Sequence, residues 1–206
     1  MSSLDAMKMT PMLKMLCRAR RLCANLKNDC SGLAATEFAV IVPVMLLMFF
    51  GTVEFSTGVA VDRKLTLIAR TLSDLTSQSI SVNDVDLTNF TTTGKAMLTP
   101  YSPTPLNSTI TELYVDPNTQ TARVQWSKGA APRGTGSTVN IPAALKVLDT
   151  YLIYSEVSYL YVPAVGYVMA KAGINLTDVA YTRPRQSDCV IYPTPTSGVI
   201  PNCPKL

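Results

Sequence analysis

A run of apolar residues near the N-terminal end is the most uneven feature of the chain. From Leu33 to Val61 the sequence has no basic residue and only two charged ones, Glu37 and Glu54. As a helix that rises 1.5 Å per residue, this run would span roughly 43 Å, more than a hydrocarbon core of about 30 Å. Apolar residues occur all round such a helix, which favours a transmembrane helix over the buried helix of a soluble domain. We therefore predict a transmembrane helix over residues 33–61.

The apolar pattern becomes periodic beyond this run, which predicts that the helix continues. Apolar residues recur at alternating spacings of four and three: Val61, Leu65, Ile68, Leu72 and Leu75. Five positions are too few to establish a coiled coil, so we prefer an amphipathic helix that covers a small sheet. Residues 62–78 are thus expected to continue the transmembrane helix as a stalk.

Polar residues dominate the next segment, and a hairpin follows it. Residues 79–108 are rich in Ser, Thr, Asn, Asp and Pro, which predicts a loop. Within it, residues 83–86 (NDVD) lack the ligands and the glycine of a calcium loop, so we interpret them as a solvated turn. Residues 109–116 and 121–129 are β-rich and flank the turn residues 117–120, a typical hairpin signal.

Alternation in the second strand of this hairpin suggests a half-buried sheet. Ala122, Val124 and Trp126 are expected on one face, with Trp126 as a core anchor rather than a ligand platform. Asn140 as a cap and Pro142 in the first turn predict a short helix. The tyrosine-rich segment 151–162 predicts a central strand, and packing of its tyrosines against the stalk helix is preferred over a ligand-binding role.

The periodicities together predict an α+β fold, in which a long N-terminal transmembrane and stalk helix precedes a small antiparallel β-rich domain, residues 79–206. The distribution of charge along the chain predicts how the helix is oriented in the membrane. Residues 1–32 hold six basic and two acidic residues, an excess of four that equals the net charge of the whole chain. A basic leader before an apolar run indicates a targeting segment, here a cytoplasmic one, and the positive-inside rule places residues 79–206 outside the cytoplasm. The apolar run is too long for an ordinary secretory signal.

Composition excludes several kinds of chemistry. The chain has no histidine, which removes histidine acid–base catalysis, Ser-His or Cys-His nucleophile pairs and histidine-ligated zinc. Gly134 and Gly136 form a G-x-G that lacks the rest of a phosphate loop. Because the basic excess lies in the leader, we expect no nucleic-acid partner. We expect no enzymatic activity, no cofactor and no metal.

The five cysteines fall into two groups on opposite sides of the apolar run. Cys17, Cys23 and Cys30 precede it, at spacings that fit no standard metal motif, and are expected to stay reduced. Cys189 and Cys203 follow it and are the exported cysteines, which predicts a disulfide between them.

The start of the apolar run resembles the processing site of type IV pilin-like precursors. In that family a basic leader ends in glycine, and glutamate is the fifth residue of the mature chain. Gly32, Leu33 and Glu37 match this pattern. The resemblance implies that a prepilin peptidase cuts after Gly32, and that Glu37 pairs with the new N-terminal amine of a neighbouring subunit. The alternative is a glutamate at the membrane interface whose spacing from Gly32 is accidental.

A wider stretch, about residues 33–75, resembles the TadE-like pilus assembly proteins. The positions that match their N-terminal signature are Glu37, Phe38, Pro43, Gly51, Glu54 and Phe55. Two later patches are similar to the family more weakly: Glu156–Val168 carries an aromatic-x-aromatic-x-proline step, and Arg183–Arg185 reads Arg-Pro-Arg.

The resemblance implies a pseudopilin-like subunit or assembly factor of a bacterial tight-adherence (Flp-type) pilus. Such a protein would be a single-pass protein of the inner membrane with a periplasmic C-terminal domain. Its expected partners are the prepilin peptidase, other pilins or pseudopilins, inner-membrane pilus assembly proteins and the lipid bilayer. The alternative is a single-pass anchor that carries a periplasmic binding or sensory domain unrelated to pili.

Overall fold

The structure, a computed structural model, describes residues 32–163, 173–196, 198–199 and 201–206. Of the expected leader only Gly32 falls in this part of the chain, so Cys17, Cys23 and Cys30 lie outside the described residues. Part of the later family-like patch, residues 164–168, also lies outside them. The chain divides into two compact units, residues 1–50 and 51–206, and helix α2 (Leu33–Ser77) contributes residues to both.

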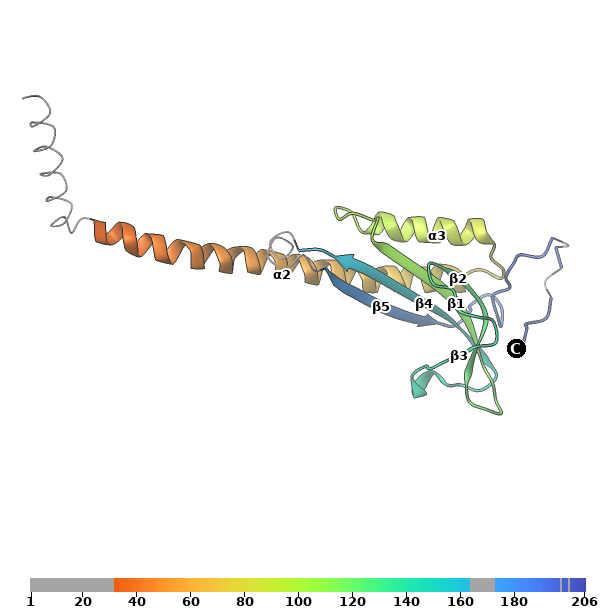
Figure 1. Ribbon diagram of the computed structural model, residues 1–206. Coiled ribbons are helices and arrows are strands. Elements are labelled where there is room, and N and C mark those ends of the chain that lie inside the picture. Colours follow the sequence, from red (N-terminus) through yellow and green to blue (C-terminus); the bar gives the residue numbers. More distant parts are fainter. Residues whose placement is uncertain (1–31, 164–172, 197, 200) are drawn as a thin grey trace, which may run out of the picture. The chain divides into compact units, whose positions relative to one another are not determined.

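Residues 51–206 contain a five-stranded antiparallel sheet with the strand order β3-β2-β1-β4-β5 (Figure 1). The strands are β1 (Leu106–Val115), β2 (Ala122–Gly129), β3 (Thr138–Val139), β4 (Thr150–Tyr161) and β5 (Ile174–Thr182). β1 and β2 form the predicted hairpin, and β4 pairs with both β1 and β5. The predicted α+β fold class is confirmed.

The C-terminal part of α2 lies on one face of this sheet. Val61, Leu65, Ile68 and Leu72 are fully buried in a core that they share with residues of β1, β4 and β5. The hydroxyl of Ser155 in β4 donates to the carbonyl of Ala69 at 2.5 Å, which brings helix and strand into direct contact. The preferred interpretation of the seam, an amphipathic helix that covers a small sheet, is thus confirmed.

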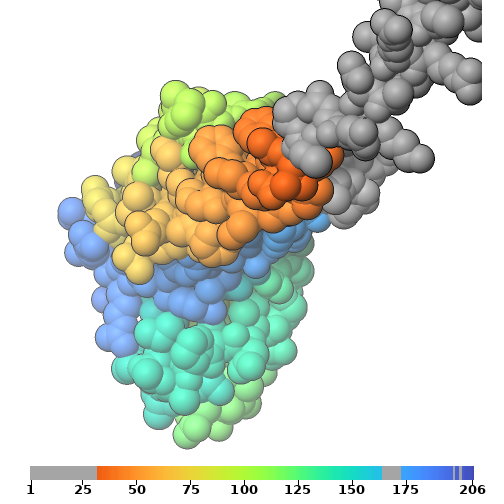
Figure 2. Space-filling view, turned by 90° about the vertical axis from the view of Figure 1, so that its left-hand side faces the viewer, coloured from red at the N-terminus to blue at the C-terminus, as the bar shows by residue number. Residues whose placement is uncertain are grey.

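A second helix, α3 (Asp84–Met97), lies where the sequence analysis predicts a loop. Four of its 14 residues are threonines, and their hydroxyls donate to backbone carbonyls three or four residues earlier in the helix. Leu87, Phe90 and Met97 point into the same core as α2, at helical spacing. Gly94 permits close packing, because a Cβ there would lie 3.0 Å from Ile68 Cγ2. Figure 2 shows the two helices, orange to yellow-green, on one side and the teal residues of the β3–β4 region on the other.

Residues 83–86 are the start of α3 rather than a solvated turn. The side chain of Asn83 accepts from the N–H groups of Val85 and Asp86, and the carboxylate of Asp86 accepts from the N–H of Asn83. These reciprocal bonds are a capping box, which satisfies N–H groups that a helix start otherwise leaves unpaired. The polar residues 83–86 thus cap and begin a helix.

A β-bulge overturns the predicted faces of β2. The β1–β2 register shifts between Glu112 and Leu113, so that Glu112 pairs with Trp126 and Leu113 with Val124. Gln125 is the extra residue, and it moves the following side chain to the other face. Ala122 and Val124 therefore belong to a cluster on the far face of the sheet, whereas Trp126 lies in the core beneath the helices. Trp126 is buried, as predicted for a core anchor.

The predicted short helix after Asn140 is only a single 3-10 turn, η2 (Ala143–Leu145). Pro142 occupies its N-cap position, and no side chain caps it. The chain leaves the helical path because Val147 N–H bonds to the carbonyl of Leu145 and Asp149 N–H bonds to that of Val115. The second of these bonds holds the chain at the end of β1, where β4 begins.

Candidate functional site

The N-terminal part of α2 is exposed along its whole apolar length. The most apolar 18-residue window of α2 contains no buried residue, and α2 is the helix that is long and apolar enough to cross a membrane among those described. No ionisable side chain occurs between Phe38 and Val53. In water such a surface would be costly at about 25 cal/mol per Å² of apolar area. The helix fits a single-pass membrane anchor.

The residues of the predicted processing site are all accessible. Gly32 lies immediately before α2, and a Cβ placed on it would meet nothing within 4 Å. Leu33 is the first residue of α2 and is exposed, and Glu37 follows one helical turn later, also exposed. Among the family-motif positions, Phe38, Pro43 and Gly51 are exposed as well. None of these positions is shielded by described residues.

The remaining two motif residues, Glu54 and Phe55, lie in a groove of residues 51–206. The groove has a volume of about 320 Å³ and a largely apolar wall. One wall is the α2 segment 54–62, including Phe55, Gly58 and Val59. The other wall is formed by Tyr161 and Pro163 at the end of β4 and by Ile174 and Leu176 of β5. We call it the Tyr161 groove.

Residues from two separate patches of the family resemblance meet in the Tyr161 groove. Tyr161 and Pro163 belong to the late aromatic-x-aromatic-x-proline step, whereas Glu54 and Phe55 belong to the N-terminal signature. The hydroxyl of Tyr161 donates to the carbonyl of Glu54 at 3.3 Å. A Cβ on Gly58 would lie 3.6 Å from Cε1 of Tyr161, an ordinary van der Waals distance, so the ring lies directly beside the helix at this residue. Tyr161 pairs with Ile174 across β4 and β5, which sets the second wall.

The other late patch, Arg183–Arg185, contacts the C-terminal end of α2. Arg185 Nη2 lies 2.6 Å from Asp74 Oδ1, and the N–H of Arg185 donates to the carbonyl of Ser77 at 2.9 Å. The first of these is a partly exposed ion pair, of a kind that contributes up to about 1 kcal/mol. The second satisfies a carbonyl of the last helical turn.

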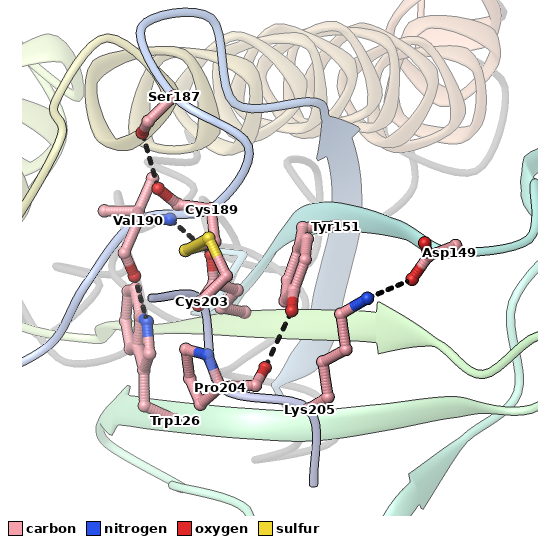
Figure 3. Close-up of a disulfide and its surroundings, with 10 residues drawn as sticks. Trp126, Asp149, Tyr151, Ser187, Cys189, Val190, Cys203, Pro204 and Lys205 are labelled. Atoms are coloured by element: carbon pink, nitrogen blue, oxygen red, sulfur yellow. Dashed lines mark hydrogen bonds and ion pairs between the residues drawn. A yellow bond between two sulfur atoms is a disulfide. The ribbon is translucent and has the colours of Figure 1, made fainter. Parts of the chain in front are cut away.

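The predicted cysteine pair closes a loop within the C-terminal segment, and hydrogen bonds from β2 and β4 hold that segment to the sheet. Cys189 and Cys203 form a disulfide with a Cα–Cα distance of 5.8 Å. Figure 3 shows the neighbouring contacts: Trp126 Nε1 donates to the carbonyl of Val190 at 2.7 Å, and the hydroxyl of Tyr151 to that of Pro204 at 2.8 Å. The proline-rich tail is thus tied to both β2 and β4.

One buried titratable residue was not singled out by the sequence analysis. Glu112 of β1 is completely buried, and its Oε1 accepts from the N–H of Val190 at 2.5 Å. Burial raises the pKa of this carboxyl to about 8, against the opposing effect of hydrogen bonds from Val190 and Trp126. Alternation could have identified it, because Glu112 shares a strand face with the core residue Ile110.

No grouping of side chains in the described part of the chain suggests a metal centre. A search of those residues for three or more His, Cys, Asp or Glu side chains at metal-binding distance found none. The expectation that the protein holds no metal stays a prediction.

The apolar helix, the antiparallel sheet packed on its C-terminal part and the groove between them define a protein with one candidate membrane anchor and an α+β domain. Residues 32–72 match the family model of TadE-like proteins. The match confirms the resemblance drawn from Glu37, Pro43, Gly51 and Glu54, and it points to association with a tight-adherence pilus system. Neither the curated proteins nor the solved structures contain a significant match to the chain.

Proposed function

We propose that the protein is a pseudopilin-like subunit or assembly factor of a bacterial tight-adherence pilus, without enzymatic activity. Residues 33–61 anchor it in the inner membrane, with the leader in the cytoplasm and residues 79–206 in the periplasm. A prepilin peptidase removes residues 1–32. Glu37 then pairs with the new amine of a neighbouring subunit, and the domain outside the membrane contacts other pilins or the assembly proteins.

The observation that carries this proposal is the position of the TadE-like match. It begins at Gly32 and covers the exposed apolar part of α2 together with the segment that packs on the sheet. Glu37 supports a role in assembly, because a carboxylate close to hydrocarbon is costly unless a cation compensates it. A newly exposed N-terminal amine would be such a cation.

The test is processing of the full chain in cells that express the cognate prepilin peptidase. N-terminal sequencing should give a mature chain that begins at Leu33, and Gly32→Val should abolish the cut. Gly51→Val is the matched control. Gly51 lies in α2 and, like Gly32, is exposed, and a Cβ on either glycine meets nothing within 4 Å. This variant should be cut like the wild type.

An intact chain that still begins at Met1 in the presence of active peptidase would contradict the pseudopilin proposal. That result would favour the alternative, a single-pass anchor with a periplasmic binding or sensory domain unrelated to pili. Reporter fusions after residues 28 and 80 test the topology separately. The first should report the cytoplasm and the second the periplasm.

A further inference from the structure

The helix wall of the Tyr161 groove forms the last part of the predicted span, residues 33–61. Its first motif residue, Glu54, directly follows the uncharged stretch that ends at Val53. A helix needs about 20 residues to cross the hydrocarbon core, so a span that starts between Leu33 and Phe38 ends between residues 52 and 57. The headgroup layer adds about 5 to 8 Å on each side. Along α2 the groove residues therefore fall at the boundary between hydrocarbon and headgroups.

The strand wall of the groove is also apolar and exposed. Ile174 is 55% exposed and Leu176 is half-buried, although both lie in the part of β5 beside α2. On the helix wall, Phe55 is 74% exposed. The next residues along α2 are charged, beginning with Asp62 and Arg63. The change from apolar to charged side chains thus takes place across the groove.

Tyr161 gives the groove an amphipathic centre. Its ring packs beside Gly58, and its hydroxyl is bonded to the helix backbone. Tyrosine is enriched at membrane interfaces, because its ring suits the acyl boundary while its hydroxyl keeps a polar partner. At this depth of the bilayer, the apolar residues around Tyr161 suit the acyl chains of phospholipid, and the tyrosine suits the boundary with the headgroups.

We propose that the Tyr161 groove binds phospholipid of the leaflet that faces the β-rich domain, with acyl-chain carbons against Phe55, Ile174 and Leu176. The end of β4 and the start of β5 thereby rest in the membrane interface and orient the domain relative to the bilayer. The inference rests on the membrane anchor of the proposed function and adds a second membrane contact made by the sheet.

The test uses tryptophan reporters in the full chain, reconstituted in phosphatidylethanolamine–phosphatidylglycerol nanodiscs that contain acyl chains brominated near the headgroup end. Trp126 is the sole tryptophan of the chain and is buried, so it supplies a constant background. Ile174→Trp and Leu176→Trp place reporters on the strand wall. Val44→Trp reports the span. Val147→Trp is the control, because Val147 precedes β4, whose first residue lies roughly 36 Å along the strand from Tyr161 at 3.3 Å per residue.

Bromine near the headgroups should remove most of the emission added at positions 174 and 176 and leave that at position 147 unchanged. Quenching of Val44→Trp by chains brominated near the methyl end, with positions 174 and 176 unquenched, would overturn the lipid inference and keep the anchor. If Val44→Trp is unquenched by either lipid, the anchor itself fails and the inference with it.

A second copy of the chain is the other occupant that the test distinguishes. If a second copy fills the groove, bromine should quench the added emission at position 174 in discs that hold one chain. In discs that hold several chains, the second copy should shield this position and the emission should remain. This concentration dependence would overturn lipid as the occupant. Equal quenching at both loadings supports it.

Discussion

Glu112 and Val190 join β1 to the C-terminal segment inside the core, through a hydrogen bond of 2.5 Å from the Val190 N–H to the Glu112 carboxyl. The second oxygen of that carboxyl, Oε2, has no hydrogen-bond partner among the described residues. Burial raises the pKa of Glu112 from an ordinary value of 4.5 to about 8. The native protein therefore holds this proton at neutral pH, where the unfolded chain has lost it.

The pKa of Glu112 predicts a fall in stability with rising pH. Between pH values of about 4.5 and about 8 the native state binds more protons than the unfolded state, so the free energy of unfolding decreases through this window. Glu112→Gln should remove this slope and stabilise the protein by a few kcal/mol at the upper end. Denaturant unfolding of the full chain in detergent, followed by Trp126 emission, measures both effects. Equal slopes for the variant and the wild type would contradict the prediction.

Loss of the disulfide should weaken the domain without affecting the anchor. Cys189 and Cys203 are 14 residues apart, and a closed loop of this size contributes about 3 kcal/mol in the chain-entropy model. Replacing both with serine should lower the free energy of unfolding by about that amount. The same replacement at the three leader cysteines is the control and should change nothing, because the proposed cut removes them. A loss below about 1 kcal/mol for the replacement of Cys189 and Cys203 would contradict the entropic account.

Gly129 is expected to be the least replaceable glycine of the sheet. Its φ is +137°, and a Cβ there would lie 2.2 Å from the carbonyl oxygen of Ser108, which also accepts from Ala130. Gly129→Ala should destabilise the protein by at least about 2 kcal/mol, because the backbone of β1 or β2 must move. Gly134→Ala is the matched control, since a Cβ there meets nothing within 4 Å. Thermal unfolding in detergent compares them, and equal midpoints would refute the argument.

The capping box predicts a local effect at the start of α3. Asn83→Ala removes the acceptor for two N–H groups and should cost about 1 kcal/mol. Hydrogen exchange should show faster exchange in the first turn of α3, with the sheet amides less affected. Asn89→Ala, at an exposed position in the same helix, is the control. Unchanged protection at Val85 and Asp86 in the Asn83 variant would speak against the cap.

Long periodic features were predictable because they repeat along one element. The apolar run and the seam of Val61, Leu65, Ile68 and Leu72 need only helical geometry to be interpreted. The β1–β2 hairpin is a local event around the turn at residues 117–120. The polar composition of residues 79–108 is typical of a loop, although the core residues of α3 recur at helical spacing. The threonine hydroxyls of α3 bond to the helix backbone, so these polar residues are compatible with a helix.

The β2 faces were beyond the reach of an alternation pattern. A bulge is one extra residue, Gln125, opposite a partner strand, and only the pairing of Glu112 with Trp126 reveals it. The environment of Glu112 also depends on contacts between distant segments, since its hydrogen-bond partner Val190 is 78 residues away in sequence. No local pattern carries a contact of that range.

The sequence by itself determined the apolar helix, its amphipathic continuation, the α+β class and the Gly32–Glu37 pattern, because each depends on spacing within a single segment. Only the tertiary structure decided that Glu54 and Phe55 share a groove with Tyr161 and Ile174. That groove exists because β4 ends and β5 begins beside α2, and the pairing of the two strands sets where this happens. Strand register and helix packing couple residues far apart in the chain, so they follow from the assembled core rather than from local pattern.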